Sequence, residues 1–101
     1  MELRHRLLGS KDSDSEEIVD ALVCDCCHTD AIVVDGSPVV VYRDRTENEI
    51  RDISLARLTD TGWVKTSAGT DGWRISGCPV NGPAIAQNNG VIGVAWFTAV
   101  P

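Results

Sequence analysis

The sequence has few aromatic residues, an excess of acid over base, and no long apolar run. Aromatic side chains make up 5% of the 101 residues, and 9 Lys and Arg stand against 15 Asp and Glu, for a net charge of -6. A nucleic-acid partner would need a basic stripe, and an anionic membrane surface would need clustered Lys or Arg. No stretch approaches the ~18 apolar residues of a transmembrane helix. The composition therefore predicts a small acidic globular domain, with no nucleic-acid partner and no membrane insertion.

What is present is a series of short strands separated by turns. The strongest signal is the pair of apolar runs 31–34 and 39–43, joined by Asp35-Gly36-Ser37-Pro38. Two such runs around an Asp-Gly turn predict a hairpin. Further strands are expected at 2–8, 18–23, 50–58, 63–65, 82–87 and 91–98. A helix over 47–58 is the alternative to the strand at 50–58.

A shift of 54 positions reproduces the hairpin and its flanks. It places Cys24 on Cys78, Asp35-Gly36 on Asn89-Gly90, and Tyr42 on Trp96. A hairpin repeat of roughly 50 residues is typical of propeller arrays. We therefore predict an all-β fold, a partial β-propeller with about two four-stranded antiparallel blades present as a half, a whole and a half. Residues 1–23 end one blade, 24–70 form a complete blade, and 71–101 hold a linker and the first hairpin of the next.

This predicted architecture leaves sheet edges open. A closed propeller needs about four to eight blades, so this span cannot close a ring alone. Either the chain is a fragment of a longer protein, which we expect, or several copies assemble. The predicted partners are accordingly the rest of the propeller, or a second copy that associates through the open blade edges.

Several segments resemble a known family. They are Cys24-Asp25-Cys26-Cys27, the run from Val40 to Arg45, and the run from Asp71 to Ala84. These are similar to bacterial sialidase-like propeller proteins, known as exo-alpha-sialidases or neuraminidase-repeat proteins, and the resemblance covers nearly the whole chain. Asp60-Thr61-Gly62-Trp63 resembles a shortened form of the family's Asp-box turn. The resemblance implies a glycan-related hydrolase family, a carbohydrate ligand, and a periplasmic or secreted location for the parent proteins.

Candidate site residues fall in loops that blade topology places on one face. Sialidases, by the resemblance, hold the sugar carboxylate with arginines, whose forked guanidinium suits that role. The candidates for ligand binding are Arg43, Asp44, Arg45, Arg51, Trp73, Arg74 and Asn81. These charges also suit a surface ion network, and Tyr42 is expected to pack because it matches Trp96. The family's Tyr/Phe-Arg-Ile-Pro motif is absent, so no catalytic residue is assigned and this chain is not expected to be catalytic alone.

The cysteines allow two interpretations. They do not form the two C-x-x-C pairs of a zinc ribbon. Either disulfides hold adjacent blades together, or thiolates and an imidazole bind zinc or copper. The residues concerned are Cys24, Cys26, Cys27, His28 and Cys78. Three functions thus remain open: a section of a sialidase-like propeller, a non-catalytic binding or interaction propeller, and a metal-binding propeller with no other cofactor.

Overall fold

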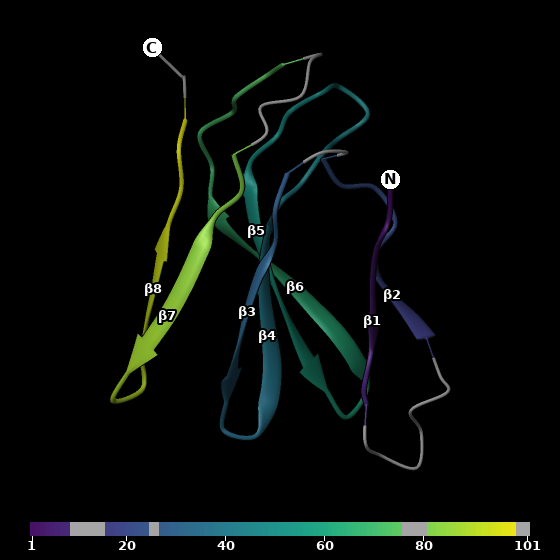
Figure 1. Cartoon of the computed structure of the whole chain (residues 1–101). Coiled ribbons are helices and arrows are strands. Elements are labelled where there is room, and N and C mark those ends of the chain that lie inside the picture. Colours follow the sequence, from purple (N-terminus) through teal and green to yellow (C-terminus); the bar gives the residue numbers. More distant parts are fainter. Residues whose placement is uncertain (9–15, 25–26, 76–80, 99–101) are drawn as a thin grey trace.

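A computed structural model describes residues 1–8, 16–24, 27–75 and 81–98, and within these ranges it contains strands but no helix. The strands form three separate antiparallel sheets, none of them closed (Figure 1). The first sheet pairs β1 (Leu3–Arg6) with β2 (Glu16–Asp20). The central sheet has the order β3 (Asp30–Val34), β4 (Ser37–Arg43), β5 (Ile53–Thr59) and β6 (Gly62–Gly69). The third pairs β7 (Ala84–Asn88) with β8 (Val91–Ala95).

The all-β prediction is confirmed, but the bounds of the strands differ from the predicted ones; β1 is shorter than 2–8, for example, and β2 covers Glu16–Asp20 instead of 18–23. The strand expected from residue 50 begins at Ile53, because Ile50 forms only an isolated bridge with Arg74. The strand expected at 63–65 extends over Gly62–Gly69, and the last strand ends at Ala95 instead of residue 98. No helix forms over 47–58. No helix of the described part of the chain is long and apolar enough to span a membrane.

The central sheet is buried on both faces, and β4 shows why. Side chains alternate between the two faces of a strand, so Val39 and Val41 point one way and Tyr42 points the other. All three are almost fully buried. A strand whose successive residues are all apolar is expected to be covered on both sides.

The three sheets are therefore stacked as layers. On one side, Val39, Val41 and Ile53 form a core with Ile85 of β7, and Val94 and Trp96 pack against it. On the other side a second core forms from Val23, Tyr42 and Ala56, with Leu3, Val19 and Trp63 packed against it. Figure 1 shows β7–β8 and β1–β2 on opposite sides of the central sheet.

The hairpins β3–β4 and β7–β8 have the same backbone geometry, as the 54-residue shift predicts. Asp35 and Gly36 have φ angles of 50° and 79°, and Asn89 and Gly90 have 51° and 80°. Positive φ at both central residues defines the turn that best suits a two-residue hairpin, and Asp, Asn and Gly tolerate it best. The registers also match, since Val34 pairs with Ser37 and Asn88 with Val91.

A second equivalence, between β1–β2 and β5–β6, lies in the strand register. The β1–β2 ladder shifts between Leu3 and Arg4, and the β5–β6 ladder shifts between Ile53 and Ser54. Leu3 therefore corresponds to Ile53. Each packs toward the next layer: Leu3 onto the central sheet and Ile53 onto β7–β8. The first sheet thus resembles the second half of the central sheet, and the third sheet resembles its first half.

A candidate functional site at the loop end of the central sheet

The loop 44–52 and the segments that flank β7–β8 lie at one end of the stack, away from the two-residue turns of the hairpins (Figure 1). The loop 44–52 contacts the segment around residue 73, because the Arg51 amide donates to the Trp73 carbonyl at 2.8 Å and the Ile75 amide to the Glu49 carbonyl at 3.0 Å. The Cys24 amide donates to the Arg43 carbonyl at 3.1 Å. The predicted site residues in these loops therefore do lie together, and two buried arginines connect them.

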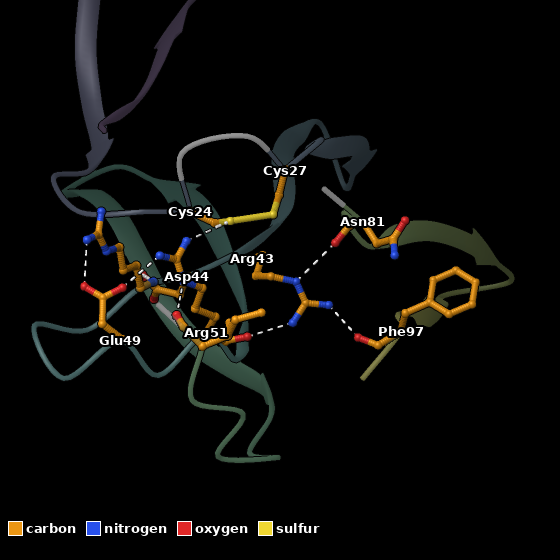
Figure 2. Close-up of a disulfide and its surroundings, with 10 residues drawn as sticks. Cys24, Cys27, Arg43, Asp44, Glu49, Arg51, Asn81 and Phe97 are labelled. Atoms are coloured by element: carbon orange, nitrogen blue, oxygen red, sulfur yellow. Dashed lines mark hydrogen bonds and ion pairs between the residues drawn. A yellow bond between two sulfur atoms is a disulfide. The ribbon is translucent and has the colours of Figure 1, made fainter. Parts of the chain in front are cut away.

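Arg43, the last residue of β4, is the first of these arginines, and it is 2% exposed. Each of its three guanidinium nitrogens donates to a backbone carbonyl: Nε to Asn81 at 3.1 Å, Nη1 to Arg51 at 2.7 Å and Nη2 to Phe97 at 2.5 Å (Figure 2). Its guanidinium carbon also lies 5.0 Å from the centre of the Trp73 ring, a cation–π contact. Burial lowers the pKa of Arg43, and the charges of Asp71 and Asp52 oppose that shift. Arg43 thus joins the central sheet to the segments on either side of β7–β8.

Arg51 is the second buried arginine, and it is 3% exposed. Its Nε donates to the Ile75 carbonyl at 3.0 Å, its Nη1 to Cys24 Sγ at 3.2 Å and its Nη2 to Glu49 Oε2 at 2.8 Å (Figure 2). Glu49 also accepts from Arg45 Nη2 at 2.7 Å. The hydrogen bonds from Arg45 and then Arg51 lower the pKa of Glu49, so this carboxylate stays charged between the two guanidinium groups.

A disulfide joins Cys24 to Cys27, with 5.8 Å between their Cα atoms. For this pair the disulfide alternative holds, but the expectation that it would bridge adjacent blades is wrong, because the bond closes a local loop beside Arg51 (Figure 2). Cys26 and Cys78 lie outside the described residues. Within the described ranges, no group of three or more His, Cys, Asp or Glu side chains is arranged to hold a metal ion. An oxidised Cys24–Cys27 pair offers no thiolate, so in this state it cannot contribute to the predicted zinc or copper site.

Asp44 belongs to a separate polar cluster next to the core. Lys65 Nζ lies 3.1 Å from Oδ2 of both Asp20 and Asp44, and Ser54 Oγ donates to Asp44 at 2.7 Å. The Tyr42 hydroxyl donates to Asp20 at 2.7 Å. Burial opposes ionisation of Asp20, but the Leu22 amide, Tyr42 and Lys65 outweigh it and lower its pKa. Burial and the Asp20 carboxylate raise the pKa of Tyr42, which stays a neutral donor.

The remaining predicted residues are nearer the surface. Arg74 is exposed, and its Nε donates to the Asn48 carbonyl at 3.0 Å. Trp73 is half-buried beneath the Arg43 guanidinium, and Asn81 takes part through its backbone carbonyl. His28 is exposed, and its backbone lies so close to Gly82 that a side chain at position 82 would collide with the His28 carbonyl.

The contacts that organise this end also include residues outside the predicted set. Asp52 accepts from the Gly72 amide at 2.8 Å, and Asp71 accepts from the Trp96 indole at 2.8 Å. The Asp-Gly pair at 71–72 is typical of a turn, but no local signal shows that the carboxylate that accepts from the Gly72 amide comes from Asp52, 20 residues away. The carbonyl acceptors of Arg43 carry no side-chain signal that a sequence could reveal.

The arrangement is a braced group of loops in which most of the charge is used within the protein. The alternative interpretation, that these charged residues form an ion network, describes Glu49 with Arg45 and Arg51, which are paired with one another. Comparison with protein-family models, with curated proteins and with solved structures gives no match for this chain.

Proposed function

We propose that the chain is a section of a sialidase-like β-propeller and that its own role is to build blades instead of carrying out catalysis. The observation that supports this proposal is that successive layers turn the same face toward the next layer. Leu3 and His5 of the first layer pack toward the central sheet, as Ile53 and Leu55 of the central sheet pack toward β7–β8. Repeated antiparallel layers that all turn the same face to the next are the units of a propeller.

The non-catalytic role follows from how the family-type residues are used. A nucleophile must reach the substrate and be activated by a neighbouring base. Tyr42 is buried, neutral and bonded to Asp20, while Arg43 and Arg51 direct their nitrogens at protein acceptors. No step of glycan hydrolysis is therefore assigned to these residues.

The ligand proposed for this section is a sugar that carries a carboxylate. Arg74 is the exposed guanidinium group of the loop end and lies beside the 44–52 loop, in which Arg45 is half-buried and paired with Glu49. Guanidinium groups bind carboxylates in a bidentate way, which suits a sialic acid better than a neutral sugar.

The test is a titration of the isotopically labelled chain with N-acetylneuraminic acid, followed by amide NMR shifts. We expect shifts confined to residues 44–52 and 72–75, their loss in Arg74→Ala, and their retention in Arg57→Ala, which removes a half-exposed guanidinium on β5. A fluorogenic sialoside should show no turnover. Absence of shifts would remove the ligand from the proposal, and turnover would contradict the non-catalytic role. A crystal structure whose layers were related by translation, without a common rotation axis, would contradict the propeller.

A further inference from the structure

The two end hairpins correspond to opposite halves of one four-stranded layer. In the central sheet, β4 pairs with β5. The third sheet ends at β8, the equivalent of β4, and the first sheet begins at β1, the equivalent of β5. Among the described strands, β8 pairs only with β7 and β1 only with β2. Each of these two edges therefore lacks the kind of strand that the other provides.

We propose that a second copy of this chain fills the gap: β1 of one copy pairs antiparallel with β8 of another and completes a four-stranded layer. This proposal rests on the proposed function, because it assumes that the layers are equivalent blades. The association is head to tail, since one copy uses its last sheet and the other its first. An apolar strand with an unpaired edge tends to form hydrogen bonds with a strand of another chain, so pairing between copies is favourable at these edges.

The central sheet supplies the register of the proposed pairing. There Val39 lies opposite Arg57, Val41 opposite Leu55, and Arg43 opposite Ile53. Transferred to the ends of the chain, this register sets Phe97 against Leu3 of the next copy, Ala95 against His5, and Gly93 against Leu7. Phe97 is 70% exposed in the single chain, and this pairing gives it an apolar neighbour.

A cavity marks the place of the missing strands on the receiving copy. It measures about 240 Å³ and lies between β1 and the β3–β4 half of the central sheet, lined by Leu3, His5, Ala31, Pro38, Val40 and Trp63 among others. On the opposite face of the central sheet, the corresponding space is occupied by β7, whose Ile85 packs against Val39 and Val41. The cavity is thus where side chains from the β7–β8 hairpin of a second copy would enter.

The outer face of β7–β8 has the shape and chemistry to enter that space. Ala84 pairs with Ala95 and Ala86 with Gly93, so the face away from the core carries small apolar side chains. Neither β7 nor β8 contains a charged residue, whereas β1 contains Arg4 and Arg6. In the proposed register Arg4 lies opposite Trp96, whose indole donates a hydrogen bond to Asp71. A guanidinium next to an aromatic ring and a carboxylate is a favourable contact.

The number of copies follows from the layer count. Each chain would contribute one complete layer and two halves, so each added copy extends the stack by two layers. A head-to-tail interface forms a closed ring if its rotation closes. Propellers close with about four to eight blades, which corresponds to about two to four copies.

The test is the mass of the intact chain in solution by light scattering, for the wild type and for Gly93→Asp. A Cβ at Gly93 meets no atom within 4 Å of it, so the single chain has room for the added side chain. We expect about two to four times the monomer mass for the wild type and the monomer mass for Gly93→Asp, with equal circular dichroism. The matched control Thr66→Asp, on the exposed edge of β6, should keep the wild-type mass.

A rescue experiment checks the register. Because Gly93 would face Leu7 of the next copy, Leu7→Lys in the Gly93→Asp chain should restore assembly, and Leu7→Asp should not. A folded monomeric wild type, or an assembly that Gly93→Asp leaves intact, overturns the proposal, and so does growth without a fixed mass. A folded monomer would leave the propeller itself in place, because other segments could supply the flanking strands.

Discussion

The hairpins β3–β4 and β7–β8 share a turn and a register but differ in what surrounds them. β4 has a strand on each side and a layer over each face, whereas among the described strands β8 has only β7 beside it. The side chains differ in the same way. Val39, Val41 and Arg43 of β4 are buried, and the positions 54 residues later hold Gly93, Ala95 and the exposed Phe97. Backbone geometry is thus fixed locally, while burial is fixed by the neighbouring layers.

The largest difference between the hairpins is expected at Arg43 and its counterpart Phe97. Arg43→Ala leaves three carbonyl acceptors without their donor, that of Arg51 in a buried contact and those of Asn81 and Phe97 in partly buried ones. An unsatisfied buried group costs about 1–3 kcal/mol and a lost hydrogen bond about 0.5–1.5 kcal/mol, so we expect a loss of at least about 2 kcal/mol in urea unfolding. In the Gly93→Asp background, which keeps the chain single, Phe97→Ala should change stability by less than about 0.5 kcal/mol, because its exposed ring is lost but its carbonyl is kept. Equal losses would show that Arg43 does not brace the loops.

A smaller difference is expected from the apolar positions of the same strands. Val41 is completely buried in the core next to β7–β8, and Val91 is 71% exposed. Val41→Ala should cost about 2 kcal/mol through lost burial and the cavity it leaves. Val91→Ala should be close to neutral in the single chain, which is best measured in the Gly93→Asp background. A costly Val91→Ala in that background would mean that β8 is already covered.

The turns should respond alike, which sharpens the comparison. Gly36 and Gly90 have nearly the same positive φ, and no atom lies within 4 Å of a Cβ at either. Gly36→Ala and Gly90→Ala should therefore each cost about 1 kcal/mol, from backbone conformation alone. Calorimetric melting of the two variants measures this. Clearly unequal shifts would show that the two turns are not equivalent.

The smallest expected effect is the pH dependence due to Asp20. Its pKa is lower in the folded protein than its ordinary value, so its contribution is present above the unfolded pKa of about 3.9 and is lost as the pH falls. Water screens this partly exposed carboxylate, so we expect less than about 1 kcal/mol. Asp20→Asn should flatten the stability curve below about pH 4. If Asp20→Asn leaves the slope of stability against pH unchanged below about pH 4, Asp20 does not cause this pH dependence.

The features that the sequence predicted are those encoded locally. Asp35-Gly36 specifies a two-residue hairpin turn because both residues tolerate a positive φ. The 54-residue shift, which places Asn89-Gly90 at the same position, predicted the second hairpin. The packing role of Tyr42 followed from its match to Trp96, and the structure confirms it.

The features that were missed depend on distant partners. Arg43 and Arg51 were candidates for ligand binding, yet their acceptors are mainly backbone carbonyls, brought close only by the fold. The partner of Cys24 could not be deduced from spacing, because four cysteines allow several pairings. Residues 1–23 were predicted to end a blade, but the residue-by-residue correspondence of β1–β2 to β5–β6 has no sequence signal, because the connection in the former pair is much longer than Asp60-Thr61.

The central claim is that the two end layers are incomplete copies of the central one and complete each other between two copies of the chain. Amide hydrogen exchange on the wild-type chain tests it most directly, by comparing β8 with β4 over a range of protein concentrations. The account predicts that the β8 amides facing away from β7 become protected as concentration rises and approach the protection of β4. Fast exchange of those amides at every concentration would contradict it.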